Sequence, residues 1–434
     1  MKVYDSYKDS GVEWMNEIPS NWEKSRIRMV GDLYGGLTGK KGSDFNDEDN
    51  LSNKPFVPFT NIFNNTYISK DHFQYVNVEE GENQNRVLKN DLFFLMSSES
   101  YEDLGKSSIL LEDVEELYLN SFCKGYRIKD SRVYPLFLNY QLLGSLHKEM
   151  ISIEGNGFTR INLRQDRLLD IPVFIPPTSE QQQIVSFLDT KTSLIDSLIK
   201  KTQRKIELLK EKRTSLINEV VTKGLNPNLE MKDSGVEWIG EIPSHWEITK
   251  MKYGVSHLSE KGKPENNDIK ISPENVESET GVCFNLYSEH DSEGMRFQKG
   301  DILLNKLRLY LKKILFTEYD GFSLGEMIVL RTNNKLNNRY FYQLLFSQGL
   351  IDLLDSQSTG IKLPRVSPDV ILNTEIIYPP LSEQHQIVEY LDEHTQLIDN
   401  TISIEEKRIE LLKEYRQSLI SEVVTGKLKV TTDE

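Results

Sequence analysis

A short basic stretch stands out in the second half of an otherwise acidic sequence. It contains Lys306, Arg308, Tyr310, Lys312 and Lys313. Lysine and arginine neutralise phosphates, and both can also hydrogen-bond the edges of bases when a loop carries them into a groove. The stretch is therefore a candidate for contact with a nucleic acid.

Further candidate side chains lie in several other segments, because Ser, Thr, Asn and Gln can also contact base edges and phosphates. In the first half of the chain the candidates are Thr38, Lys40, Lys41, Ser97, Ser98, Tyr101, Lys106, Thr159, Arg160, Asn162 and Arg164. In the second half they also include Lys261, Lys263, Thr359, Lys362 and Arg365. For each residue the alternative is an ordinary solvated side chain. We expect only a minority to touch nucleic acid, more often at a phosphate than at a base.

The overall charge counts against this interpretation. The formal net charge is −15, whereas neutralisation of phosphates by Lys and Arg usually dominates affinity for nucleic acid. The objection weakens if the acidic residues lie away from the binding face or if partner subunits supply positive charge. Binding depends on local patches, while net charge describes the whole surface.

The motifs of several enzyme classes are missing. An amino-methyltransferase needs Asn or Asp before a Pro-Pro pair, whereas Ile175 and Tyr378 precede the two pairs here. The segment GLTGKKG contains Lys40, but no Ser or Thr follows it as a phosphate-binding loop requires. The histidines form no HExxH pattern, so we expect no zinc site. The sequence predicts neither catalytic nor metal-binding residues.

Composition predicts a cytoplasmic protein without a membrane segment. No apolar run is long enough to span a bilayer, and residues 1–10 lack the apolar core of a signal peptide. Cys123 and Cys283 lie far apart in the sequence, so they form neither a disulfide framework nor a cysteine zinc site. A reducing compartment is therefore expected.

Two segments of the chain occur twice. The arm at 8–23 reads KDSGVEWMNEIPSNWE, and the arm at 232–247 reads KDSGVEWIGEIPSHWE. Residues 176–225 and 379–428 form the second repeated pair, and both contain IELLKE. The inserts between arm and second repeat differ much more. A frame that is kept while its inserts diverge indicates one shared role for the frame and different roles for the inserts. The alternative is duplication of a structural unit without functional meaning.

Only faint similarities remain inside the inserts. Residues 140–143 and 342–345 both read YQLL, which suggests that they are equivalent. The loops at 157–160 and 360–362, each opened by a glycine, also fall at matching places.

Each copy of the second repeat predicts a long helix. Ser179 and Ser382 follow Pro-Pro pairs and are predicted to cap the helix starts, and Gly224 and Gly426 mark the ends. Seam residues then alternate by four and three, which is the heptad pattern of a coiled coil. The seams are Ile195, Ile199, Thr202, Ile206, Leu209, Arg213, Leu216 and Val220, and Ile398, Ile402, Glu405, Ile409, Leu412, Arg416, Leu419 and Val423.

A helix of this length needs a partner, and the other copy is the obvious one. If a pseudo-twofold axis relates the halves, the two helices run antiparallel and the inserts lie at opposite ends. The alternative is that each helix packs on its own domain. Arg213 and Arg416 are expected to be rim residues whose stems lie along the apolar surface. The repeated arms carry Trp14, Trp22, Trp238 and Trp246, which we expect to be packing anchors.

The predicted fold class is α+β, with two mixed α/β domains separated by two long antiparallel helices that form a coiled coil within a pseudo-twofold repeat. The predicted segments are a repeated arm at 1–22, a variable domain at 23–178, a helix at 179–224, a second arm at 225–247, a second variable domain at 248–380, a helix at 381–428 and a tail at 429–434.

These features resemble the specificity (S) subunit of type I restriction-modification enzymes. The helix start PP-x-S-E-Q-x-Q-I-V occurs at 176–185 and again at 379–388. Residues 299–304 resemble the family's GDIL strand, and 89–94 are a weaker counterpart with Asn90 in place of glycine. Residues 57–62 resemble another common strand of the family, of which the second domain lacks a clear copy. The resemblance covers nearly the whole chain.

The resemblance implies a subunit that catalyses nothing itself. Each variable domain would be a target recognition domain that reads one short part of a split, asymmetric site in double-stranded DNA. The helices would set the distance between these parts and dock two copies of an adenine methyltransferase subunit. ATP-dependent restriction subunits would complete the complex. S-adenosylmethionine, ATP and Mg would then bind to partner subunits, and no cofactor to this chain.

Two alternatives keep part of this interpretation. The chain could serve a different methyltransferase-containing defence system, which keeps the DNA reading and changes the partner. It could also be a coiled-coil scaffold that binds protein only, which predicts no affinity for DNA.

Overall fold

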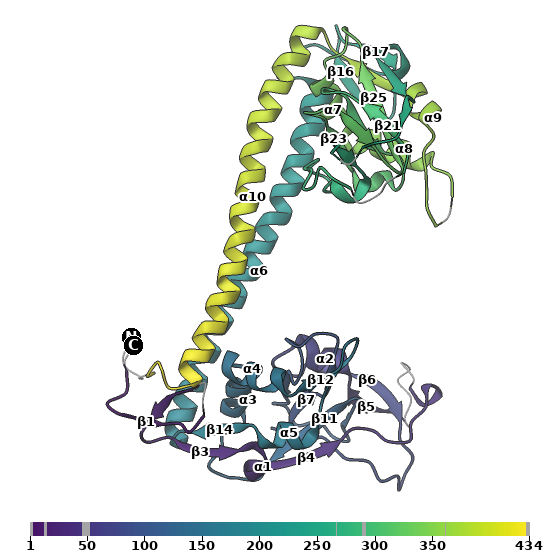
Figure 1. Ribbon diagram of the computed structural model, residues 1–434. Coiled ribbons are helices and arrows are strands. Elements are labelled where there is room, and N and C mark those ends of the chain that lie inside the picture. Colours follow the sequence, from purple (N-terminus) through teal and green to yellow (C-terminus); the bar gives the residue numbers. More distant parts are fainter. Residues whose placement is uncertain are drawn as a thin grey trace. The chain divides into compact units, whose positions relative to one another are not determined.

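The computed structural model describes residues 3–12, 15–45, 53–265, 267–288, 292–360 and 362–430. The chain divides into two compact units. Unit 1 comprises Met1–Lys201 with Arg408–Glu434, and unit 2 comprises Thr202–Lys407. Each unit therefore contains one arm, one variable domain and parts of both long helices. Many of these elements are labelled in Figure 1.

The centre of unit 1 is an antiparallel sheet with strand order β4-β11-β7-β9. Its strands are β4 (Gly31–Gly35), β11 (Cys123–Ile128), β7 (Leu92–Leu95) and β9 (Ser107–Ile109). All side chains of β7 are buried, because alternate residues of a strand point to opposite faces and both faces are covered. Leu92 and Phe94 enter one hydrophobic core, while Phe93 and Leu95 enter another.

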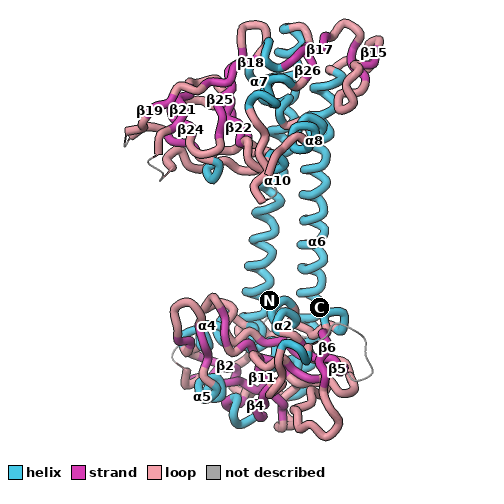
Figure 2. The backbone as a smooth tube through the Cα atoms, turned by 90° about the vertical axis from the view of Figure 1, so that its right-hand side faces the viewer, coloured by secondary structure: helices cyan, strands magenta, loops and turns pink. Residues whose placement is uncertain are grey.

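Smaller sheets and helices surround this sheet (Figure 2). The small sheets have strand orders β10-β5-β6 and β12-β13-β8, and β14 pairs with β3. Their bounds are β3 (Glu23–Arg26), β5 (Asn53–Val57), β6 (Gln74–Asn77), β8 (Ser97–Ser98), β10 (Tyr118–Leu119), β12 (Gly155–Asn156), β13 (Ile161–Leu163) and β14 (Pro172–Ile175). The helices are α1 (Ile27–Val30), α2 (Phe59–Asn64), α3 (Pro135–Leu143), α4 (Ser145–Ile153) and α5 (Gln165–Asp170).

Unit 2 repeats the central sheet in the same order, as β18-β25-β22-β23. These strands are β18 (Val255–Leu258), β25 (Met327–Thr332), β22 (Ile302–Asn305) and β23 (Ile314–Phe316). Strand β22 again divides its buried side chains, since Ile302 and Leu304 enter one core and Leu303 enters another. The second sheet is different, with strand order β19-β21-β24-β20.

Unit 2 also contains this second sheet, a strand pair equivalent to one in unit 1, and short helices. The second sheet contains β19 (Lys261–Gly262), β20 (Lys270–Ile271), β21 (Gly294–Phe297) and β24 (Gly321–Ser323). Strand β17 (Glu247–Lys250) pairs with β26 (Glu375–Tyr378), as β3 pairs with β14. The helices are α7 (Asn338–Leu345), α8 (Gln348–Ser356) and α9 (Pro368–Asn373).

The two long helices are α6 (Thr178–Lys223) and α10 (Leu381–Val424). Within unit 1 the first part of α6 lies beside the last part of α10, and within unit 2 the last part of α6 lies beside the first part of α10 (Figures 1 and 2). The pairing is antiparallel in both units. The seam residues are buried or half-buried, as the heptad pattern predicts. Within the described ranges, no helix combines the length and the apolar character needed to cross a bilayer.

The ends of the helices differ in detail from the sequence prediction. Ser179 and Ser382 lie inside the first turn, because Pro177 and Pro380 supply the carbonyls that accept the first helical hydrogen bonds. Helix α10 ends at Val424, since Gly426 adopts a φ of 73° and the amides that follow turn back to earlier carbonyls. A left-handed glycine of this kind is a common helix terminator.

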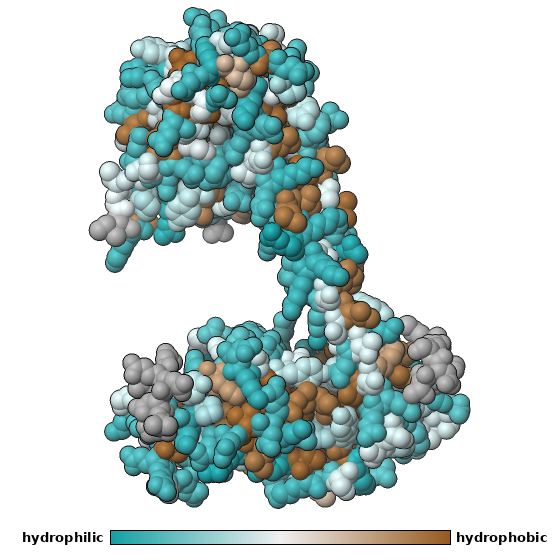
Figure 3. All heavy atoms as spheres, turned by 180° about the vertical axis from the view of Figure 1, so that it is seen from behind, coloured by the Kyte–Doolittle hydropathy of each residue, from teal (hydrophilic) through white to brown (hydrophobic). Residues whose placement is uncertain are grey.

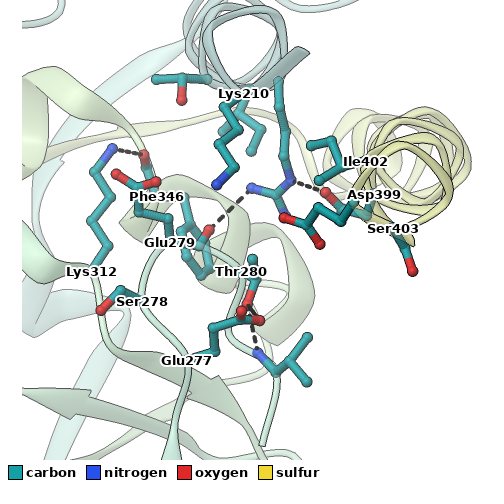
Figure 4. A pocket seen from close by; sticks show the side chains of 15 residues that line it. Lys210, Glu277, Ser278, Glu279, Thr280, Lys312, Phe346, Asp399, Ile402 and Ser403 are labelled. Atoms are coloured by element: carbon teal, nitrogen blue, oxygen red, sulfur yellow. Dashed lines mark hydrogen bonds and ion pairs between the residues drawn. The ribbon is translucent and has the colours of Figure 1, made fainter. Parts of the chain in front are cut away.

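Two arginines of the seam form ion pairs between the helices, so the expectation of simple rim residues was wrong. Arg213 Nε lies 2.9 Å from Asp399 Oδ1 in unit 2, and Arg416 Nε lies 3.0 Å from Asp196 Oδ1 in unit 1. Both pairs occupy equivalent positions of the repeat, but only Arg213 Nε also makes a hydrogen bond to its carboxylate. Arg213 also donates to the carbonyl of Glu279, at a hollow of about 320 Å³ where α6 and α10 meet the loop 277–282 (Figure 4).

The arms form two short hairpins, β1 (Tyr7–Asp9) with β2 (Glu17–Pro19), and β15 (Met231–Asp233) with β16 (Glu241–Pro243). Trp22 and Trp246 follow them and are completely buried, as expected of packing anchors. Trp238 packs half-buried against the main core of unit 2, while Trp14 lies outside the described residues.

Candidate nucleic-acid interface

In unit 1 the structure brings several candidates together at the hairpin formed by β12 and β13. Strand β8 pairs with β13, which places Ser97 and Ser98 beside the hairpin. The guanidinium of Arg160 donates to Ser97 Oγ over 2.9 and 3.2 Å, and the hydroxyl of Tyr101 donates to the Gly157 carbonyl over 3.3 Å. Both serines are buried, so they position Arg160 and the hairpin and do not themselves face solvent.

The other candidates on this hairpin are Thr159 and Asn162, and both are exposed. Asn162 donates to the carbonyl of Arg160 over 3.2 Å. Arg164 follows directly, but its guanidinium forms two hydrogen bonds with the Asp166 carboxylate. The hairpin therefore offers one arginine, Arg160, that has no carboxylate partner among the described residues.

The remaining candidates of unit 1 lie in separate places. Lys40 forms an ion pair of 2.6 Å with Glu82, and the amide of Thr38 donates to Gln84, so this loop is held by the segment 82–84. The exposed side chain of Lys41 continues the same loop. Lys106 lies over the ring of Phe63 at 4.6 Å. Within the described ranges, no hydrogen bond or ion pair joins the loop at 38–41 to the hairpin.

Unit 2 has an equivalent arrangement after β22. Leu307 forms a bridge with Arg365, and Thr359 forms a second bridge with Arg365, so the described residues 359–360 and 362–365 form a hairpin beside the basic stretch. Lys306 and Arg365 both pair with Glu326, over 3.2 and 2.7 Å. Exposed Lys362 lies on this hairpin, whereas Ile361 lies outside the described residues.

The basic stretch itself turns its side chains in opposite directions. Arg308 and Lys312 adopt φ values of 52° and 47° at the two ends of the short helical turn Leu309–Leu311. Such left-handed conformations are unfavourable for residues with a Cβ, so the surrounding packing must hold them. Buried Leu309 anchors the turn, while Arg308 and Tyr310 reach the surface.

Lys312 does not reach the surface. It is 5% exposed, and its ammonium donates to the Phe346 carbonyl and to Gln348 Oε1. Burial lowers the pKa of this ammonium below its ordinary value. Neighbouring Lys313 donates to the Pro273 carbonyl over 2.7 Å. The contacts of Lys312 therefore assign it a structural role inside unit 2, and its ammonium does not face a ligand at the surface.

A hollow of about 470 Å³ adjoins the exposed part of the stretch in unit 2. Asn305, Arg308 and Lys313 provide polar atoms along its wall, and Leu307 and Leu311 provide apolar surface. Lys261 and Lys263 belong to a different region, because β19 pairs with β21 in the second sheet. Both lysines are exposed.

Two aspartates that were not among the sequence candidates position these loops. Asp91 and Asp301 are each 1% exposed and each accepts two hydrogen bonds from an arginine, Arg127 or Arg331, on the adjacent strand. Burial, together with the Asp91 carboxylate, raises the pKa of the neighbouring Tyr34 hydroxyl. The aspartate of the GDIL motif is therefore a structural residue that holds β7 and β22 in place.

The residue before each aspartate explains a difference between the two motifs. Asn90 and Gly300 have φ values of 70° and 89°, and the turn is closed by an amide donating to the aspartate. Glycine adopts this conformation freely, and asparagine is the residue that tolerates it best among the others. Asn90 can therefore replace the glycine of the motif without loss of the turn.

The Ser-Glu-Gln segment that opens each long helix joins three parts of its unit. Trp22 Nε1 donates to Glu180 and Trp246 Nε1 donates to Glu383, each over 2.9 Å. The next residue, Gln181, donates to the Pro176 and Arg132 carbonyls and accepts from the amide of Tyr134. Gln384 makes the equivalent contacts in unit 2. Because this segment occurs twice in the sequence, its role in connecting the parts of each unit could have been predicted.

These contacts also correct the alignment of the two inserts. Tyr140 donates to Asp189, and Gln343 donates to Asp392, the equivalent position of the repeated helix. Tyr140 therefore corresponds to Gln343, and the YQLL similarity was one residue out of register. The described ranges contain no cluster of three His, Cys, Asp or Glu side chains that could hold a metal ion.

Comparison with known proteins identifies the family. The model of the "Type I restriction modification DNA specificity domain" matches residues 19–208 and 260–414. The MjaVIII specificity subunit of Methanocaldococcus jannaschii is 26% identical over 99% of this chain and 98% of its own length. The EcoKI specificity subunit of Escherichia coli is 23% identical over 95% of this chain and 90% of its own length.

Solved structures share the fold. A chain from the type I R-M system, studied for complex assembly and conformational transition, superimposes with a TM-score of 0.72 at 13% identity, covering 95% of this chain and 99% of its own. The HsdS subunit of Thermoanaerobacter tengcongensis gives 0.54 at 14% identity over 95% and 98% of the two chains. The matches to both repeats, together with the duplicated α+β architecture, show that this chain belongs to the DNA specificity subunits of type I restriction-modification systems.

Proposed function

We propose that each unit of this specificity subunit reads one part of a split, asymmetric DNA site. The observation that carries this proposal is a repeated scaffold with different side chains at the equivalent hairpins. Unit 1 presents Arg160 and Asn162 there, whereas unit 2 presents Lys362 and Arg365 on its hairpin and Arg308 on the basic stretch beside it. Base pairs differ in their pattern of donors and acceptors, so different side chains on one scaffold would select different bases.

Ion pairing divides the candidates into two groups. Arg160 and Arg308 are exposed and have no carboxylate partner among the described residues, which favours direct contact with DNA. Lys306 and Arg365 share Glu326, so a phosphate would have to compete with that carboxylate. Pairing with Glu326 lowers the positive charge around Lys306 and Arg365. The cations free to bind DNA would then be few, which is consistent with the net charge of −15.

The long helices would dock two identical methyltransferase subunits. Leu194 on α6 and Leu397 on α10 are equivalent in the repeat, and both are exposed outside the seam. Leu208 and Leu411 form a second equivalent pair of exposed leucines. Figure 3 shows apolar side chains reaching the surface on the helical segments among hydrophilic neighbours. Repeated apolar positions suit two copies of the same partner, because each copy meets the same residues.

The chemistry would then belong to the partners. Methyltransferase subunits would bind S-adenosylmethionine and modify adenine, and restriction subunits would use ATP and Mg. This chain would contribute target choice and would bind no cofactor itself.

The test is base-resolution mapping of adenine methylation in host DNA with and without the gene. Loss of one split motif on deletion is the expected result, and replacement of residues 248–375 by those of a relative should alter only one part of that motif. Alteration of both parts would refute the assignment of one part to each unit. An unchanged methylation pattern, with the methyltransferase partner co-expressed, would refute DNA reading itself.

A further inference from the structure

One aromatic side chain of unit 1 projects from the candidate interface and belongs to no hydrophobic cluster of the described residues. Phe158 lies at the tip of the hairpin formed by β12 and β13, and its relative exposure is 104%. The tip is tightly built, because Gly157 has a φ of 138° and a Cβ there would lie 2.1 Å from the Arg160 carbonyl oxygen. The hairpin therefore presents a whole phenyl ring to solvent on a narrow, closely bonded support.

Two other aromatic side chains contact residues of this hairpin and are already engaged there. The ring of Phe122 is exposed, but the guanidinium of Arg160 lies 5.5 Å from its centre. Tyr101 donates its hydroxyl to Gly157, which holds the hairpin from one side. Phe158 belongs to none of the hydrophobic clusters of unit 1. Its ring therefore contributes little to folding and is available for contact with a bound molecule.

We propose that Phe158 inserts between stacked base pairs of the half-site that unit 1 reads. This inference rests on the proposed function, because it takes duplex DNA as the occupant of the hairpin surface. Duplex DNA is favoured over a protein partner because the same hairpin carries exposed Asn162 and Arg160, an exposed cation with no carboxylate partner in the described part of the chain. Apolar side chains that enter DNA beside basic ones act as wedges that unstack a base step and bend the duplex.

Insertion would give unit 1 a form of specificity that hydrogen bonds do not supply. Pyrimidine–purine steps open more easily than other steps, so a wedge favours sites that place such a step under the hairpin tip. Arg160 would hold the adjacent backbone or base while the ring takes the place of a stacking neighbour. Phe158 is thus assigned as a specificity-determining residue of the first half-site.

The experiment uses the complex of this chain with its methyltransferase partner and duplexes that carry 2-aminopurine at successive positions of the mapped target. This base fluoresces more strongly when it loses its stacking neighbour. The methylated adenine, which the partner must take out of the stack, serves as an internal reference. The variants are Phe158→Ala, Phe158→Trp and, as the matched control, Phe284→Ala, which removes an exposed phenyl ring from unit 2.

The expected result is a second fluorescent step, confined to the half-site of unit 1. Phe158→Ala should abolish it and weaken binding about tenfold, Phe158→Trp should retain it, and Phe284→Ala should leave it unchanged. An identical second signal in Phe158→Ala, or its absence from the wild-type complex on its preferred target, would overturn the wedge. Loss of methyltransferase binding in Phe158→Ala would instead indicate a protein contact. If the wild-type complex does not prefer the target over a scrambled duplex, the proposed function fails, and the wedge fails with it.

Discussion

Replacement of Asp301 by asparagine should destabilise unit 2 strongly, although it exchanges only one carboxylate oxygen for an NH2 group. The carboxylate is buried and accepts hydrogen bonds of 2.6 and 2.7 Å from Arg331 and one of 2.7 Å from the Gln298 amide. Asparagine has one oxygen and one NH2 group, so it cannot accept all of these bonds, and its NH2 group would face another donor. A half-exposed arginine would also lose its counter-ion.

The size of the effect follows from the burial of the two partners. Removing one member of a fully buried ion pair costs about 3–5 kcal/mol, but solvent reaches part of the Arg331 side chain and screens the loss. We therefore expect a loss of about 2–3 kcal/mol in the free energy of unfolding. For a unit of this size that corresponds to a fall in the unfolding temperature of roughly 5–10 °C.

Hydrogen exchange measured by mass spectrometry provides the assay, because it resolves the two units. Asp301→Asn should speed exchange in β22 and β25 and leave β7 unchanged. Asp166→Asn is the matched control, since Asp166 binds Arg164 in the same two-bond geometry at the exposed surface, where such pairs contribute about 0–1 kcal/mol. If Asp301→Asn falls within about 0.5 kcal/mol of the wild type or of Asp166→Asn, the structural role assigned to Asp301 is incorrect.

Three further outcomes are expected. Burial lowers the pKa of His147 to about 4, so the contribution of its neutral ring to the stability of unit 1 is complete above the unfolded pKa near 6.5 and is lost as the pH falls toward 4. In urea unfolding, the free energy of unfolding of unit 1 should be about 2 kcal/mol smaller at pH 5 than at pH 7. The variant His147→Gln should not show this difference. Trp246→Phe removes the indole hydrogen bond to Glu383 and should lower the free energy of unfolding, measured by thermal unfolding, by about 1.5–3 kcal/mol. An unchanged unfolding midpoint would contradict the structural role assigned to the Ser-Glu-Gln segment. Leu397→Glu should lower methyltransferase binding from two copies toward one in native mass spectrometry, and a full complement would argue against docking at α10.

The repeated frame could be predicted from the sequence because its signals are local or duplicated. Heptad spacing depends only on neighbouring turns of one helix, so the buried seams of α6 and α10 were predictable residue by residue. Duplication made the antiparallel pairing the natural solution. The tryptophans of the arms were predictable as anchors for the same reason, since Trp22 and Trp246 recur in one context.

The candidate interface was only partly predictable, since it depends on contacts between distant segments. Sequence alone put Arg308 and Lys312 in one basic stretch, but in the fold Arg308 is exposed, while Lys312 is buried against residues 346–348. Asp91 and Asp301 belong to a strand motif that the sequence revealed, but their structural role was not predictable, because their arginines lie on strands that become neighbours only in the folded sheet.

The sequence by itself therefore determined the family, the two-fold organisation and the helix pair. Periodicity and repetition can be read from the sequence of the frame, and they do not depend on the sequence or the packing of the inserts. Only the tertiary structure decided which polar side chains face solvent and which brace the sheet, because burial depends on the packing of segments far apart in the chain. The same packing leaves Phe158 alone at a hairpin tip, where composition and spacing give no sign of it.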